Sequence, residues 1–147
     1  MMRNFITNIL SWLGIQKNQS GPHVRIIAFG AFDPVDEGNT DFLKQAKTLG
    51  DHLLVVVAHD SAIRAYKHRD PIAPETDRLR TVQKLGIADE VIIGRKTADR
   101  YHMLGEVAFD ILALGYNQAP TNEEVERELK RFGKYNVKVV RLKQHNR

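Results

Sequence analysis

The stretch "AFGAFDPVDEGNTDFLKQAKTLGDHLLVVV", residues 28–57, decides the fold. It begins near the end of an apolar run that starts at Val24, passes through a glycine-containing loop, and ends in a second apolar run from Leu53. Between the two runs lies a helical pattern over residues 40–49, with apolar positions at Phe42, Leu43, Ala46 and Leu49. A strand, a loop, a helix and a strand in this order predict a parallel βαβ unit.

The same alternation continues along the chain. Further apolar runs lie at residues 90–94, 110–116 and 137–142, and further helical patterns at residues 75–85, 101–107 and 122–132. The segment between residues 59 and 75 is expected to be a polar loop. Because the second run is apolar at nearly every position, it fits a strand covered on both faces. We predict an α/β domain with a doubly wound parallel sheet of five strands.

In such sheets, ligands bind beyond the carboxyl ends of the strands, where the strand order reverses. This rule selects the loops after Phe29, Ala58, Gly94 and Gly115. The first of them, "GAFDPVDEGN", contains Gly30 and Gly38, where a backbone can approach a ligand closely. It leads into a helix whose first N–H groups, expected at residues 39–41, favour an anion. The loop nevertheless carries an acid at Asp36.

Composition limits the possible functions. At 147 residues, 42% of them hydrophobic, the chain has the size of one ordinary domain. It has no cysteine, which excludes disulfides and thiolate metal sites, and we expect a cytoplasmic protein. A net charge of +4 without a long basic run suits a nucleotide and does not indicate nucleic acid. The histidines lack the spacing of metal ligands, so no metal site is expected. His59 is a candidate general acid or base; the alternative is a structural role at the end of its strand.

Residues 1–22 are interpreted as an appended amphipathic helix and a polar linker, and residues 23–147 as the domain. The apolar face of the helix is formed by Phe5, Ile9, Trp12 and Leu13. The segment is too short for a membrane span and lacks the features of a secretory signal. It is expected to dock on the domain or on a second copy, or else to make a weak interfacial contact with a membrane.

Four segments together resemble the cytidylyltransferase-like nucleotidyltransferases, a family that includes glycerol-3-phosphate cytidylyltransferases and FAD synthetases. They are "GAFDPVDEGN", "FLKQAKTLGDHLLVVVAHD", "DRLRTVQKLGIADEVIIG" and "DILALGYNQ", and the resemblance covers residues 24–142. It implies a Rossmann-like fold and the transfer of a nucleotidyl group from CTP or ATP to a phosphorylated alcohol, with release of pyrophosphate. It further implies Mg²⁺ as cofactor and a homodimer.

The first loop departs from the family pattern G-[TV]-F-D-x-x-H-x-G-H, in which both histidines contact phosphates. Asp36 and Asn39 occupy those two positions here. A carboxylate about 4 Å from a phosphate costs about 4 kcal/mol at an effective dielectric constant of about 20. We therefore expect Asp36 to oppose phosphate binding. Asn39 keeps a neutral donor, so catalysis should suffer more than binding.

Other positions take their expected roles from the resemblance. The backbone at Ala31 and Phe32 meets the nucleotide, although Phe32 fits the core equally well. Asp33 is expected to cap its turn rather than to ligate a metal. Lys67 stands where the family has a phosphate-contacting cation, which His68 or Arg69 could replace; a solvated loop is the alternative.

Two further segments carry expected binding residues. Arg78 would approach a phosphate, or else pair with Glu75 or Asp77 on the surface. In "LGYNQ", the resemblance implies that Gly115, Asn117 and Gln118 contact the nucleotide, with Asn117 at the ribose or base. The hydroxyl-rich "ISSTKI"-like segment of many relatives is missing from the C-terminal region, which removes a second phosphate anchor.

Three hypotheses remain open at this point. The chain is an active nucleotidyltransferase, or an inactive relative that acts as a nucleotide-binding or interaction module. In the third, Asp36 and Asn39 are substitutions within an otherwise active parent. The sequence leaves open whether CTP or ATP is the donor, and which alcohol is the acceptor.

Overall fold

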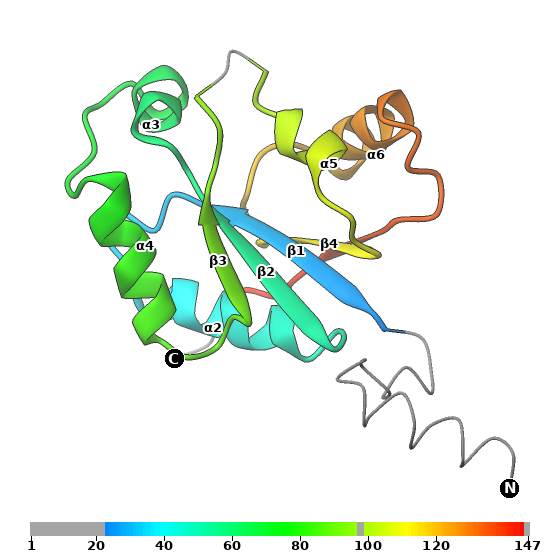
Figure 1. Cartoon of the computed structure of the whole chain (residues 1–147), viewed down its shortest axis with the longest axis horizontal. Helices are drawn as coiled ribbons and strands as arrows, with labels where there is room; N and C mark the ends of the chain where they lie inside the picture. Colours follow the sequence, from blue (N-terminus) through cyan, green and yellow to red (C-terminus); the bar gives the residue numbers. More distant parts are fainter. Residues whose placement is uncertain (1–22, 97–98, 146–147) are drawn as a thin grey trace, which may run out of the picture.

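The computed structural model describes residues 23–96 and 99–145. Its five strands form one parallel sheet in the order β3-β2-β1-β4-β5 (Figure 1). The strands are β1 Arg25–Gly30, β2 His52–Val57, β3 Glu90–Ile93, β4 Ile111–Leu114 and β5 Lys138–Arg141. The strand order reverses at β1, which pairs with β2 on one side and β4 on the other. The predicted doubly wound, Rossmann-like α/β fold is confirmed.

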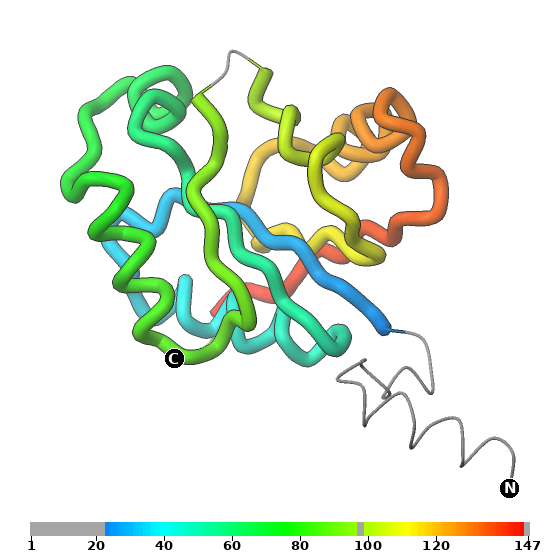
Figure 2. Tube along the Cα trace, in the orientation of Figure 1, coloured from blue at the N-terminus to red at the C-terminus, as the bar shows by residue number. Residues whose placement is uncertain are grey.

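The sheet is covered on both faces. The helices are α2 Glu37–Lys47, α3 Asp60–Lys67, α4 Glu75–Lys84, α5 His102–Glu106 and α6 Asn122–Arg131. Helices α2 and α4 pack on one face, and α5 and α6 on the other, as the chain trace in Figure 2 shows. Alternate residues of β1 therefore point into different apolar clusters: Ile26 contributes to the first and Ile27 to the second. This explains why the strands are apolar at successive positions.

The structure corrects two of the predicted elements. Helix α3 occupies part of the segment expected to be a polar loop, and it escaped notice because Ile63 is its only buried residue. Helix α2 begins at Glu37, three residues before the predicted start, because Asp36 provides its N-cap. A capping side chain fixes where a helix begins, whereas apolar periodicity shows only where the helix meets the core.

The helix expected within residues 1–22 lies outside the described residues. Among the described residues, both apolar clusters are built from side chains between Ile26 and Leu142. Within the described ranges, no helix is long and apolar enough to cross a membrane.

Deletion of the first 21 residues is expected to leave a folded domain, because the polar linker "QKNQSG" separates them from β1 and the described residues already form two apolar clusters. The free energy of unfolding should change by less than about 1 kcal/mol. Thermal unfolding of the truncated and full-length chains, followed by circular dichroism, measures this. A truncated chain that melts without a cooperative transition would mean that the segment belongs to the core.

Candidate active site

The loops that follow β1 and β4 meet at the carboxyl edge of the sheet. The side chain of Gln118 accepts a hydrogen bond from the Gly115 amide at 3.0 Å and donates one to the Phe29 carbonyl at 3.1 Å. One amide side chain thus joins the loop after β4 to the end of β1, at the point where the strand order reverses. This is the edge at which doubly wound sheets bind ligands.

The beginning of the first loop is packed against itself. A Cβ atom on Gly30 would lie 2.7 Å from Cε2 of Phe32, so the ring of Phe32 fills the space that was expected to admit a ligand. Phe32 is only 3% exposed and adopts a positive φ of 52°, a strained conformation for an aromatic residue. The side chain of Phe32 thus packs in the core, as one of its two expected roles requires, and this packing needs a glycine at position 30.

Asp36 and Asn39 bind one another in a reciprocal capping box. Oδ1 of Asp36 accepts from the Asn39 amide at 2.7 Å, and Oδ1 of Asn39 accepts from the Asp36 amide at 3.1 Å. The Thr40 amide also bonds to the Asp36 carbonyl. The N–H groups expected to receive a phosphate at residues 39 and 40 are therefore engaged. Only the first amides of α2, at Glu37 and Gly38, lack an intrahelical partner by helix geometry.

This capping box gives the acid in the loop a physical reason. A carboxylate at the N-terminus of a helix satisfies orphan amides and interacts favourably with the helix dipole. The carboxylate of Asp36 thus lies at the N-terminus of α2, where helices commonly bind an anion from solution.

Asp33 anchors a distant segment to the first loop. Its side chain is fully buried and accepts hydrogen bonds from Nη1 of Arg69 at 2.8 Å and from the amides of Ile72 at 2.8 Å and Ala73 at 3.0 Å. Burial tends to raise the pKa of Asp33, but these hydrogen bonds outweigh it, and the pKa lies below its ordinary value. Asp33 therefore holds the loop before α4, and Arg69 is committed to it.

Asp33→Asn is expected to lower the free energy of unfolding by about 2–3 kcal/mol at pH 7, because hydrogen bonds to a charged acceptor are lost. The pKa of Asp33 is lowered on folding, so its contribution is full above the unfolded-state pKa of about 3.9 and disappears as the pH falls through the folded-state value. Urea titrations of both chains at pH 7 and near pH 3 measure the difference, which should shrink at low pH. An equal difference at both values would contradict this account.

Arg78 lies in the interior, only 2% exposed. Its guanidinium donates to the carbonyls of Ala73 at 2.9 Å, Ala31 at 2.8 Å and Ala58 at 2.8 Å, and to Oδ1 of Asp60 at 2.6 Å. The expected surface pair with Glu75 or Asp77 is wrong, because the guanidinium is buried and donates to these three carbonyls and to Asp60. Arg78 instead ties the loops after β1 and β2 to the start of α4.

The remaining basic candidates lie around α3. Lys67 is the last residue of α3 and is exposed, beyond the carboxyl end of β2. His59 caps the same helix: Nδ1 accepts from the Ser61 amide at 3.1 Å, and Nε2 lies 3.4 Å from Oε2 of Glu75. The structure therefore favours the structural role for His59 and leaves Lys67 available to a ligand.

Sequence reasoning missed Arg141, which shapes the loop after β4. From the end of β5, its guanidinium donates to the carbonyls of Gly115 at 2.8 Å, Gln118 at 2.6 Å and Pro120 at 3.0 Å, and to Oδ1 of Asn122 at 2.7 Å. The only signal was a basic residue that ends an apolar run. An open hollow of about 360 Å³ adjoins this arginine and is lined by Tyr116, Asn117, Gln118, Ala119, Pro120, Thr121 and Glu124.

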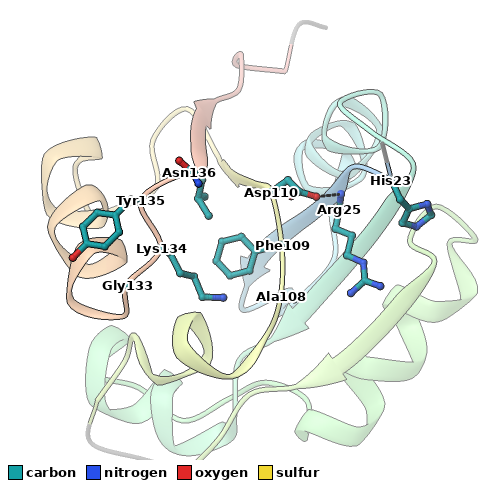
Figure 3. Close-up of a pocket in the computed structure, with 10 residues that line it drawn as sticks. His23, Arg25, Ala108, Phe109, Asp110, Gly133, Lys134, Tyr135 and Asn136 are labelled. Carbon is teal, nitrogen blue, oxygen red and sulfur yellow. Dashed lines mark hydrogen bonds between the residues drawn. The ribbon is translucent and has the colours of Figure 1, made fainter. Parts of the chain in front are cut away.

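A larger hollow, of about 690 Å³, lies at the opposite, amino edge of the sheet (Figure 3). Its lining includes Arg25, Phe109 and Lys134. The ammonium of Lys134 donates to the Val107 carbonyl and lies 4.4 Å from the centre of the Phe109 ring. None of the predicted site residues borders it. Across residues 23–96 and 99–145, no group of three or more His, Asp or Glu side chains could hold a metal ion.

Comparison with known proteins identifies relatives along nearly the whole domain. The cytidylyltransferase-like family model matches residues 27–146. The FAD synthase of Thermococcus onnurineus is 39% identical over 119 residues, which cover 81% of this chain and 79% of that protein. The FAD synthase of Aciduliprofundum boonei is 42% identical over 122 residues, covering 83% and 80%.

A solved structure has the same fold. It is described as the lipopolysaccharide core biosynthesis protein from Thermoplasma volcanium GSS1, and it matches with a TM-score of 0.78 and 35% identity over 85% of this chain and all of that one. The family model extends from within β1 to beyond β5, and the relatives and this structure each cover more than four fifths of the chain. The chain belongs to the cytidylyltransferase-like family and is a nucleotidyltransferase.

Proposed function

We propose that this nucleotidyltransferase is an FAD synthase, which joins the adenylyl group of ATP to FMN. The observation that carries the proposal is the match to proteins named FAD synthase over about four fifths of both chains. FMN is a phosphorylated alcohol, so it agrees with the acceptor class that the family resemblance implies. Of the two candidate donors, the proposal selects ATP.

In the proposed reaction, a phosphate oxygen of FMN attacks the α-phosphorus of ATP and forms the new P–O bond of FAD. The bond between the α-phosphorus and the bridging oxygen breaks, and pyrophosphate leaves with that electron pair. The protein contributes positioning and charge stabilisation rather than a covalent intermediate.

Each substrate is assigned to a part of the carboxyl edge. The triphosphate lies over the amides of Glu37 and Gly38 at the start of α2, and the adenosine extends toward Asn117 in the hollow of about 360 Å³. Lys67 receives the phosphate of FMN. Arg78 and Arg141 position the loops without contacting either substrate.

The metal expected with this reaction is Mg²⁺, which proteins commonly bind through one or two carboxylates together with substrate phosphates. The described residues fit that mode better than a protein cage, since no group of three or more acidic or histidine side chains among them could hold a metal ion. Held mainly through the phosphates of ATP, Mg²⁺ would neutralise charge on the triphosphate. Asp36 uses Oδ1 in its helix cap and is not assigned to the ion.

A nucleotide-binding module without turnover is the second candidate, and the capping box favours it. The two positions that are histidines in the family pattern bind each other here, and neither side chain can become a cation in the transition state. We further propose a homodimer, as the family resemblance implies, and a cytoplasmic location, in line with the lack of cysteine. Analytical ultracentrifugation tests the association state.

Incubation of the chain with FMN, Mg²⁺ and either ATP or CTP, followed by chromatography of the flavins, tests the proposal. FAD should form with ATP and not with CTP. ATP binding by calorimetry without pyrophosphate release would support the binding module instead. Faster turnover of CTP with glycerol 3-phosphate than of ATP with FMN would overturn the assignment of substrates.

A further inference from the structure

Large apolar side chains are exposed at few places on the described surface. They are Tyr66 (43% exposed), Ile72 (73%), Tyr116 (49%) and Tyr135 (74%). Tyr135 borders the hollow at the amino edge, whereas the other three belong to segments that follow the carboxyl ends of β2 and β4. Three of these four exposed side chains, two of them tyrosines, therefore lie at the edge where the substrates are proposed to bind.

Tyr66 is stacked with an arginine from a different part of the chain. Cζ of Arg100 lies 4.5 Å from the centre of the Tyr66 ring and 5.6 Å from the centre of the Tyr101 ring. Tyr66 belongs to the last turn of α3, and Arg100 precedes α5; both segments lie beyond the carboxyl ends of the strands (Figure 1). The guanidinium and the two rings form a cluster, here called the aromatic–arginine cluster, whose members are Tyr66, Arg100 and Tyr101.

One side of this cluster is held firmly. The hydroxyl of Tyr101 donates to Oε2 of Glu124 in α6 at 3.0 Å. Burial, together with this hydrogen bond to a carboxylate, raises the pKa of Tyr101 to about 12, so its ring remains neutral at physiological pH. Glu124 thus holds the Tyr101 ring against the guanidinium of Arg100. Tyr66 and Arg100 remain exposed to solvent.

We propose that Tyr66 and Arg100 form the stacking platform for the isoalloxazine ring of the acceptor, an inference that rests on the function proposed above. A flat aromatic ring binds well to an aromatic face, and a planar guanidinium can stack on it as well. Lys67 follows Tyr66 directly on α3, so the ring platform and the proposed ligand of the acceptor phosphate lie at the same end of this helix. The ribityl chain of FMN would span the two.

This assignment separates the two substrates in space. The acceptor ring is bound by residues that follow β2 and β3, and the adenosine by residues that follow β4. An acceptor without a ring, such as glycerol 3-phosphate, could use Lys67 but would gain nothing from the platform. The aromatic–arginine cluster is thus a determinant of specificity toward flavin.

The test compares Tyr66→Leu, which keeps apolar bulk but removes the ring, with Tyr66→Phe, which restores it. Tyr135→Leu, at the opposite edge, is the matched control. FMN binding is measured by quenching of flavin fluorescence, and KM is measured separately for FMN and ATP. Tyr66→Leu and Arg100→Gln should each weaken FMN binding about tenfold, as loss of one stacking partner does for a nucleobase. Tyr66→Phe and Tyr135→Leu should bind FMN as the unaltered chain does, and the KM for ATP should not change.

The outcomes distinguish this inference from the proposed function. If the unaltered chain makes FAD and Tyr66→Leu binds FMN equally well, the platform is wrong and the function stands. If the chain makes no FAD but binds FMN in a manner that depends on Tyr66, the function is wrong and the platform stands. A chain that does not bind FMN overturns both. An equal loss of ATP binding in Tyr66→Leu would mean that the substitution disturbs the fold of the edge, and it would overturn the specific role of the ring.

Discussion

Replacement of Arg78 by methionine is expected to lower the free energy of unfolding by about 3–5 kcal/mol, because it removes one partner of a buried ion pair. Methionine fills much of the same space, but it leaves the carbonyls of Ala31, Ala58 and Ala73 and the carboxylate of Asp60 without their donor. Turnover should fall by about 10²-fold in the fraction that remains folded, since these bonds set the position of two site loops.

Two variants make this expectation specific. Arg78→Lys should lower the free energy of unfolding less than Arg78→Met does, because it keeps the positive charge. It should still lower it, because one ammonium group cannot reach all the acceptors that surround the planar guanidinium. Arg80→Met lies on the same helix, where Arg80 is exposed and pairs weakly with Asp77 at 3.4 Å. Its unfolding free energy should change by less than about 0.5 kcal/mol. Guanidinium titrations of the three variants give the order, and an Arg78→Met chain as stable as Arg80→Met would refute the account.

The double substitution Asp36→His and Asn39→His is expected to raise the affinity for ATP at least about tenfold. It removes a carboxylate that repels the triphosphate and supplies two donors that can carry positive charge, each worth about 1.5–3 kcal/mol when bonded to a phosphate. The same change breaks the capping box, which should lower the free energy of unfolding by about 1 kcal/mol. A histidine can itself serve as an N-cap, as His59 does for α3 through Nδ1, so the loss of stability should not be larger than this.

Calorimetry with ATP and Mg²⁺ at two salt concentrations measures this effect. Asp36→Asn is the control, since asparagine keeps the cap and removes only the charge. If repulsion dominates, Asp36→Asn alone should give most of the gain, and the gain should shrink at high salt. If direct contacts dominate, only the double-histidine chain should bind ATP more tightly, and its higher affinity should persist at high salt. Equal affinity of the unaltered chain and the double-histidine chain would mean that Asp36 faces away from the phosphates or faces the metal.

The sequence by itself determined the architecture. Apolar runs from Val24, Leu53 and three later positions predicted all five strands, because a strand buried on both faces must be apolar along its length. It also identified the family, since several separated segments match in order. The capping box could have been found as well: Asp36 and Asn39 have the required spacing of three residues, but the apolar periodicity that was used places the helix at its contact with the core.

Only the tertiary structure decided what holds the site together. Arg78 binds Ala31, Ala58 and Asp60, which lie 18–47 residues away along the chain. Asp33 binds partners 36–40 residues away, and Gln118 reaches across 89 residues to Phe29. Such contacts depend on which strands are neighbours in the sheet, and no local pattern specifies that order. An arginine at the start of an amphipathic helix has the same local signature whether it faces water or a ring of carbonyls. The burial of Arg78 was fixed by the loops that close over it.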